Sequence, residues 1–282
     1  MSLALLLAIV LTSSAWAAEG PADQAFRRGL DAFERGTFAD AIAGWSEAVR
    51  LYEREGNRAG QERALRSLGQ AHASLGQYQQ ALARLEEARA LAEPSRDPAR
   101  VAPVLASLGS IELAAGQLDR AEPHLREAVT QARARGDGRL AAAALNDLGS
   151  LLVLRQKPAE ALDAYRESAA LARGAGYRTL AAQSLSNASS VLRQTGRIPE
   201  AKTALDEGLD QLLPAPPSHD TSFALVNVGL GYRDLAATFP DRAEVMRRSA
   251  TALNAAVAAA ERIGDRRAAS YARCYLGMVY ED

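Results

Sequence analysis

The sequence predicts an all-α protein built from repeated helical hairpins. Apolar residues recur at spacings of 3 and 4, as on one face of a helix, and residues 67–92 (SLGQAHASLGQYQQALARLEEARALA) contain two such stretches separated by a glycine. Aromatic residues make up only 5% of the chain, and no long window alternates apolar and polar residues as a half-buried strand would. A fixed repeat period supports the same prediction.

Small residues recur every 40 residues in three series that run in step. The first series is Gly29, Gly69, Gly109, Gly149, Ser189 and Gly229, with Gly277 following after 48 residues. The second is Ala41, Ala81, Ala121, Ala161 and Ala201, and the third is Gly36, Gly76, Gly116, Gln156 and Gly196. A fixed period of this length is typical of stacked repeat units.

Each series has a physical explanation. A glycine inside a helix costs about 1 kcal/mol relative to alanine, so the first series predicts places where a side chain would block the close approach of two helices. The alanines of the second series are expected at the matching contact on the second helix of each hairpin. The third series predicts left-handed residues that end the first helices.

The spacing of these residues resembles the tetratricopeptide pattern. In the second unit the matching positions are Leu65, Leu68, Gly69, Gly76, Tyr78, Ala81, Leu85 and Ala88, and in the first they are Gly29, Gly36, Phe38, Ala41, Trp45 and Ala48. The resemblance covers about residues 21–282 and implies a right-handed α-α superhelix, a tetratricopeptide-repeat (TPR) solenoid of about six and a half helical hairpins. The expected units are approximately 22–57, 58–97, 98–137, 138–177, 178–217, 218–265 and an incomplete 266–282.

The units are longer than the usual tetratricopeptide unit of about 34 residues. In this respect they resemble the repeats of kinesin light chains and the N-terminal repeat regions of bacterial CHAT-domain (caspase-like) proteins. The sixth unit departs further, because PAPPSHD (214–220) precedes it and ATFPDRAEVMRRSAT (237–251) lengthens it.

Composition argues against several classes of function. The 33 basic and 34 acidic residues nearly cancel, so the chain has no electrostatic footprint for nucleic acid or an anionic membrane. His72, His124 and His219 lie far apart, and no phosphate-binding glycine loop, zinc spacing or catalytic triad pattern is present. Cys274 has no partner for an intrachain disulfide and is expected to be a small packing residue. The sequence therefore predicts no catalytic residue, no metal, no cofactor and no small-molecule substrate.

The N-terminus carries the features of an export signal. Residues 3–11 (LALLLAIVL) are continuously apolar, and Ala15-Trp16-Ala17 offers the small-x-small pattern of a cleavage site. We therefore expect a signal peptide at 1–17 and a TPR array at 18–282 that is exported, periplasmic or extracellular. No Lys or Arg precedes the apolar run, so an N-terminal membrane anchor and a misplaced start codon remain alternatives.

The resemblance implies that the first helices line a concave groove that holds an extended peptide or a partner helix. From the repeat offsets, the candidate groove residues are Phe26, Leu30, Phe33, Arg63, Arg66, Gln70, Ser110, Asn146, Ser150, Gln183, Ser186, Ser190, Arg193, Leu230 and Arg233. Arg63 and Arg66 suggest a clamp for a carboxylate, since arginine pairs bidentately with such groups. The Lys and Asn set of the chaperone-tail clamp known in this family is not reproduced.

Three functional hypotheses follow. The favoured one is a non-catalytic scaffold for protein–protein interaction, with a peptide or protein partner in the groove. The alternative is the N-terminal regulatory or substrate-recruiting part of a longer CHAT-type peptidase, and a weaker third is an outer-membrane lipid or polymer assembly factor. The final YLGMVYED (275–282) belongs to the first helix of a seventh unit, 266–282, that lacks its second helix, which predicts an exposed apolar edge available for self-association or docking.

Overall fold

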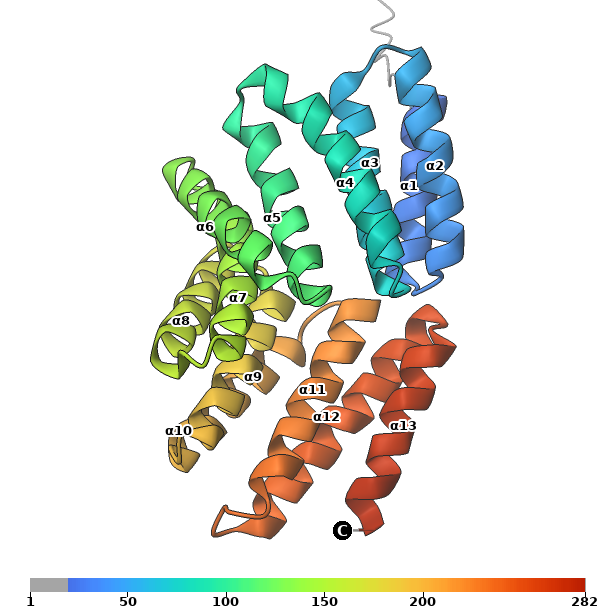
Figure 1. The fold of residues 1–282 in the computed structure, drawn as a ribbon. Coiled ribbons are helices and arrows are strands. Elements are labelled where there is room, and N and C mark those ends of the chain that lie inside the picture. Colours follow the sequence, from blue (N-terminus) through green and yellow to red (C-terminus); the bar gives the residue numbers. More distant parts are fainter. Residues whose placement is uncertain (1–19, 282) are drawn as a thin grey trace, which may run out of the picture.

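The computed structural model describes residues 20–281, which fold into a stack of helical hairpins (Figure 1). The predicted export signal lies outside the described residues. The helices are α1 (Pro21–Glu34), α2 (Phe38–Arg54), α3 (Arg58–Ser74), α4 (Tyr78–Ala92), α5 (Pro98–Ala114), α6 (Leu118–Ala134), α7 (Gly138–Leu154), α8 (Pro158–Gly174), α9 (Arg178–Gln194), α10 (Ile198–Leu212), α11 (His219–Leu235), α12 (Arg242–Ile263) and α13 (Arg266–Glu281), with a short 3-10 helix, η1 (Glu93–Ser95), after α4. Residues 20–281 contain no strand, so the all-α prediction is confirmed.

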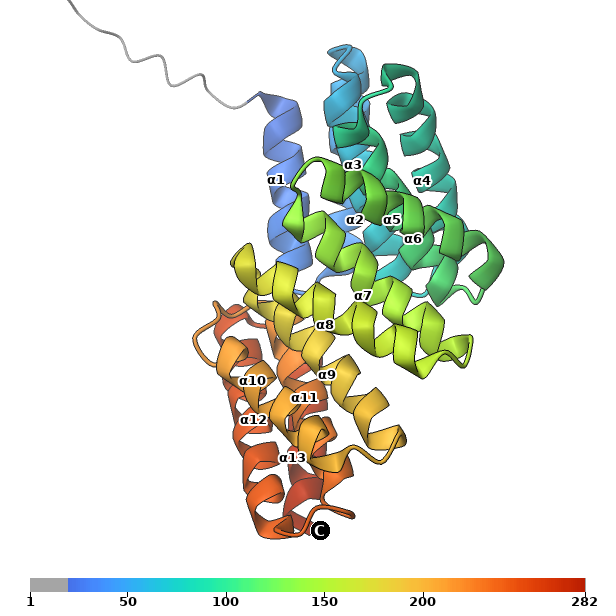
Figure 2. The same ribbon diagram turned by 90° about the vertical axis from the view of Figure 1, so that its left-hand side faces the viewer.

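The hairpins follow one another around a superhelix. Each odd-numbered helix up to α11 packs against the even-numbered helix that follows it, and neighbouring odd-numbered helices also touch, as in α3 with α5 and α5 with α7. Figures 1 and 2 show the hairpins turning progressively from α1–α2 to α11–α12, with α13 added as a single helix. The predicted solenoid of six and a half hairpins is thus the architecture of the described chain.

The first glycine series marks the closest helix crossings. A Cβ atom on Gly29 would lie 2.5 Å from Trp45 Cδ1, and one on Gly109 would lie 2.6 Å from Leu125 Cγ. The predicted close approach is therefore confirmed, but the side chain that fills the space belongs to a large residue four positions after the matching alanine of the second series. The alanines of the second series also lie near these glycines. A Cβ atom on Gly109, for example, would lie 3.2 Å from the carbonyl oxygen of Ala121.

The third series forms the turns within the hairpins. Its four glycines have φ values between 72° and 77°, and Gln156 occupies the same left-handed conformation with φ of 59°. The backbone N–H of Gln156 donates to the Val153 carbonyl, and that of Lys157 donates to the Leu152 carbonyl, as at the glycine turns. The predicted helix-ending role is confirmed, and Gln156 adopts a conformation that side chains other than glycine seldom take.

Replacement of Gln156 by glycine is expected to stabilise the protein. The left-handed conformation costs a residue with a Cβ about 1–2 kcal/mol, part of which glycine returns as extra freedom of the unfolded chain, so we expect a gain of about 1 kcal/mol. Urea unfolding followed by circular dichroism would measure it. Gly116→Gln, at the equivalent turn, should lose a similar amount, and an unchanged stability in both variants would contradict this interpretation.

The two ends of the array meet. Figure 1 shows the α1–α2 turn above the beginnings of α11 and α13. The rings of Phe38 and His219 lie edge to face with centroids 5.1 Å apart, and His219 Nδ1 is hydrogen-bonded to Asp265 Oδ2 at 2.6 Å. Asp265 is buried, and its other carboxylate oxygen accepts the backbone N–H of Ala268 at the start of α13. We call Phe38, His219 and Asp265 the closing contact.

Helix α13 leaves an apolar side uncovered. It buries Ala268, Ala269, Ala272 and Val279, whereas Tyr271, Met278 and Tyr280 are 46%, 44% and 71% exposed. The exposed apolar edge predicted for the seventh unit is present, while self-association through it stays a prediction. The expectation that Cys274 is a packing residue is wrong: its side chain is exposed, because α13 packs on one side only.

Candidate functional site

A hollow of about 350 Å³ lies between the first helices of the second, third and fourth hairpins. We call it the central hollow. Its apolar lining is Pro103, Ala106, Leu140, Ala143 and Ala144, and its polar lining is Arg66, Gln70, Ser107, Ser110, Asp137, Arg139 and Asp147. Since α3, α5 and α7 are all first helices, the hollow lies on the side of the array where the sequence predicted a groove. Its volume falls within the range of sites that bind small ligands or segments of a peptide.

Helix α3 supplies Arg66 and Gln70, which lie one turn apart. Asn57 caps this helix: its side chain accepts the backbone N–H of Gly60 at 2.9 Å and so fixes the start of α3. Arg66 Nε is buried and has no hydrogen-bond partner in the structure. Burial lowers the pKa of Arg66, the negative charge of Glu62 opposes this effect, and the positive charges of Arg139 and Arg63 add to it.

Glu62 is not a close partner of Arg66. It is buried, and its carboxylate pairs with Arg100 Nε at 3.2 Å. Burial raises the pKa of Glu62, while the hydrogen bond from Arg100 and the charges of Arg66, Arg100 and Arg63 lower it. The Arg66 guanidinium therefore faces the hollow without a carboxylate of its own.

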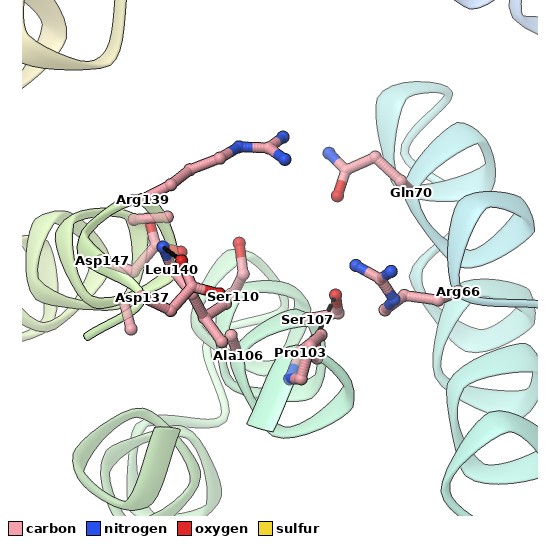
Figure 3. A pocket seen from close by; sticks show the side chains of 12 residues that line it. Arg66, Gln70, Pro103, Ala106, Ser107, Ser110, Asp137, Arg139, Leu140 and Asp147 are labelled. Carbon is pink, nitrogen blue, oxygen red and sulfur yellow. Dashed lines mark hydrogen bonds between the residues drawn. The ribbon is translucent and has the colours of Figure 1, made fainter. Parts of the chain in front are cut away.

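Helix α7 supplies Arg139 in its first turn. Asp137 caps this helix by accepting the backbone N–H of Leu140 at 2.9 Å, so its carboxylate is already engaged. The Arg139 guanidinium lies 5.0 Å from the centroid of the Tyr177 ring, and Figure 3 shows it extending across the hollow toward Gln70. Among residues 20–281, neither Arg66 nor Arg139 forms an ion pair with a carboxylate.

Asp147, two turns further along α7, is a carboxyl group of the hollow with a shifted pKa. Burial raises the pKa of its carboxyl group to about 6, although hydrogen bonds from Ser110 and Asn146 oppose the shift. The charge of Asp147 consequently changes within the range of physiological pH.

Three of the predicted groove residues, Arg66, Gln70 and Ser110, are brought together in the central hollow. Two of the predicted residues at the N-terminal end, Phe26 and Phe33, pack against Trp45 within the first hairpin. The Phe26 carbonyl accepts the Trp45 indole N–H at 3.1 Å, and the Phe33 ring lies 5.5 Å from the Trp45 ring. Leu30 is 42% exposed.

Arg63 differs from Arg66 in having partners. Its guanidinium lies 4.3 Å from the centroid of the Phe26 ring and donates a hydrogen bond to the Tyr52 hydroxyl at 3.1 Å. It also lies 3.7 Å from Asp23, which accepts a hydrogen bond from Tyr52. The two arginines proposed as a clamp are thus not equivalent.

Asn146 and Ser150 are held by neighbouring helices. Asn146 is buried, and its Oδ1 atom accepts hydrogen bonds from Ser184 at 3.2 Å and Asn187 at 3.0 Å. Ser150 accepts a hydrogen bond from the Tyr165 hydroxyl at 3.0 Å and donates to the Asn146 carbonyl. These polar contacts link α7 to α8 and α9.

The remaining predicted residues lie beyond the central hollow. Arg193 lies 3.7 Å from Asp234, and Arg233 contacts Met278 and the Tyr275 ring. Leu230 is half-buried in the core that includes α11 and α12. The others, Gln183, Ser186 and Ser190, follow one another along α9.

Sequence reasoning missed Ser107, Arg139 and Asp147. Ser107 and Asp147 each stand two residues before a glycine of the first series, so the repeat offset contained a signal for both. No cluster of three or more His, Cys, Asp or Glu side chains suited to a metal ion occurs in the described part of the chain. Within the same residues, no helix combines the length and the apolar character needed to cross a bilayer.

Solved structures with the same architecture were found by comparison. A Rap protein complexed with competence and sporulation factor is matched with a TM-score of 0.66 and 14% identity, over 91% of this chain and 74% of that chain. The Rap conjugation gene regulator of plasmid pLS20, in complex with the Phr* peptide, is matched with a TM-score of 0.66, 16% identity and the same coverage. A kinesin light chain with TPR-like repeats from Podosopora anserina is matched with a TM-score of 0.51 and 17% identity, over 68% of this chain and 96% of that chain. These similarities concern the fold.

No curated protein matches the sequence. A family model described as tetratricopeptide repeat matches residues 22–93 and 100–174, which together make up just over half of the chain. The match includes α3, α5 and α7, whose side chains line the central hollow. The chain therefore belongs to the tetratricopeptide repeat family.

Proposed function

We propose that this protein is a non-catalytic scaffold that binds an extended peptide segment of a partner protein in the central hollow. The observation that supports this function best is the hollow itself, which three consecutive first helices line with both polar and apolar side chains. Such a surface suits a peptide, because backbone amides need hydrogen-bond partners when side chains beside them are buried. The Rap regulator of pLS20, which shares the fold, is complexed with a peptide.

A blocking variant tests this proposal. Peptides selected from a random library for binding to the wild-type chain should bind Ser110→Trp at least about tenfold more weakly, because an indole would occupy the hollow. Thr203→Trp is the matched control, since Thr203 lines a different hollow between α8, α9 and α10. Circular dichroism would confirm that both variants fold. Equal losses in the two variants, or no loss in either, would contradict binding at the central hollow.

The CHAT-type alternative stays a prediction. The family model and the matched structures cover the repeat array only. A caspase-like reading frame directly downstream of the last codon would favour that alternative, and its absence from the genomic sequence would remove it.

A further inference from the structure

Two guanidinium groups share the central hollow, and among the described residues neither forms an ion pair with Asp137 or Asp147, the carboxylates that also line it. Arg66 comes from α3 and Arg139 from α7, and the charge of Arg139 contributes to lowering the pKa of Arg66. Figure 3 shows the two side chains extending into the hollow from opposite sides, with Gln70 on the same side as Arg66. Like charges in a partly desolvated site repel one another, and an anion placed between them would relieve that repulsion.

The unsatisfied donor of Arg66 distinguishes it from the arginines nearby. Arg63, one turn earlier on the same helix, is paired with Asp23 and Tyr52, and Arg100 on α5 is paired with Glu62. In contrast, Arg66 Nε is buried and makes no hydrogen bond. A buried donor without a partner is costly, and the Arg66 side chain as a whole is only half-buried at the edge of the hollow. A ligand that brings an acceptor to the accessible part of its guanidinium would therefore bind with a corresponding gain.

The chemistry of the site selects a carboxylate. A guanidinium donates in a planar fork that matches the two oxygens of a carboxylate, and the Gln70 amide adds a further donor beside the fork. On the basis of the peptide-binding function proposed above, we infer that the central hollow holds a carboxylate of the bound peptide between Arg66 and Arg139, and that Asp147 makes this binding dependent on pH.

The other charged groups around Asp147 define the pH effect. On its own helix it shares the hollow with Arg139 and with the N-cap residue Asp137, from α5 it accepts a hydrogen bond from Ser110, and from α3 Arg66 lines the same hollow. On α8, the pKa of Tyr165 is raised mainly by burial and also by the negative charge of Asp147. No histidine lines the hollow, so Asp147 is the group there whose charge changes near neutral pH.

The sign follows from the raised pKa. Above about pH 6 Asp147 is ionised, and its charge opposes a second carboxylate in the hollow. Below that value Asp147 is neutral, whereas Asp and Glu side chains and a peptide C-terminus, with ordinary pKa values of about 3.5 to 4.3, stay ionised. Binding of an acidic peptide should therefore strengthen as pH falls from about 7.5 to about 5.5.

Three immobilised hexapeptide pools, otherwise randomised without Asp or Glu, test the inference by surface plasmon resonance with the full chain. The first pool has one internal glutamate and an amidated C-terminus, the second has a free C-terminal carboxylate, and the third has neither. The wild-type chain should bind the first or second pool at least about tenfold more tightly than the third. Whichever pool is preferred identifies the source of the carboxylate.

Substitutions test which residues cause the preference for a carboxylate and its dependence on pH. Arg66→Gln/Arg139→Gln should lose the preference, whereas Arg63→Gln, a matched control one turn away, should keep it. Asp147→Asn should bind at pH 7.5 as tightly as the wild type does at pH 5.5, without a pH dependence of its own. Thermal melts would confirm that each variant is folded.

The two proposals fail differently. Equal binding of all three pools, or a preference that survives in the double arginine variant, would overturn the carboxylate site and leave peptide binding intact. A pH profile that Asp147→Asn leaves unaltered would overturn the role of Asp147. Binding of none of the three pools would overturn the proposed function together with the inference.

Discussion

Leu125→Ala is expected to lower the free energy of unfolding by about 2–5 kcal/mol, the range for emptying a fully buried leucine site. Leu125 is completely buried, and its branched end lies where a Cβ atom on Gly109 would be, between α5 and α6. The two helices are held at their spacing by other contacts, so they should close the cavity only in part. Urea unfolding followed by circular dichroism at 222 nm would measure the loss.

Leu154→Ala is the control for this prediction. Leu154 lies at the end of α7 and is 60% exposed, so its replacement should change the stability by no more than about 0.5 kcal/mol. Equal effects of the two substitutions would contradict the packing of large residues against the glycine series.

Phe38→Ala is expected to separate the two ends of the array and to cost about 3–5 kcal/mol, as for other buried phenylalanines. The Phe38 ring is buried, and its centroid lies 5.2 Å from the centroid of the Phe33 ring and 5.1 Å from that of the His219 ring. Repeat arrays are held together mainly by contacts between adjacent units, and the closing contact adds one between the first and the last. Its loss should let the superhelix open.

Distances between spin labels at Ala39 and Arg267, in a Cys274→Ser background, would follow this opening. The wild-type chain should give one narrow distance distribution, and Phe38→Ala should give a longer and broader one. Leu75→Ala is the matched control, because Leu75 lies at the equivalent turn of the second hairpin and is 41% exposed. An unchanged distribution in Phe38→Ala would show that the closing contact does not hold the ends together.

Local features of the fold could be predicted from the sequence because each unit repeats them. Position 109 requires glycine because the Leu125 side chain of the adjacent helix fills the space that a Cβ atom would take. Position 116 favours glycine because its backbone is left-handed. Contacts of this kind recur every 40 residues and so leave a periodic trace. Gly56, Gly136 and Gly176 are also left-handed, at the turns between units, and the same period relates them to one another. The sequence predictions covered left-handed residues only at the turns within hairpins.

The closing contact could not be predicted in this way. It joins the first hairpin to α11 and α13, and their meeting depends on the pitch of the superhelix, which accumulates small rotations over all the units. The one sequence signal was the departure at 214–220, where PAPPSHD interrupts the repeat and supplies His219.

Only part of the lining of the central hollow could be predicted, because the lining also depends on how each helix is rotated about its axis. Arg66, Gln70 and Ser110, three of the residues selected from the repeat offsets, line the hollow. They selected Asn146 on α7, whereas the side chain that lines the hollow there is the next residue, Asp147, and Asn146 is buried against α9. A shift of one residue along a helix rotates the side chain by about 100°, so a small change in the orientation of α7 decides which of the two side chains faces the hollow.

Hydrogen–deuterium exchange of the full chain, with and without a peptide selected for binding, tests the central claim most directly. If the peptide lies in the central hollow, bound peptide should slow exchange in the segments of α3, α5 and α7 that carry Arg66, Ser110 and Asp147. Exchange that slows only in the second helices α4, α6 and α8, or only in α13, would contradict it.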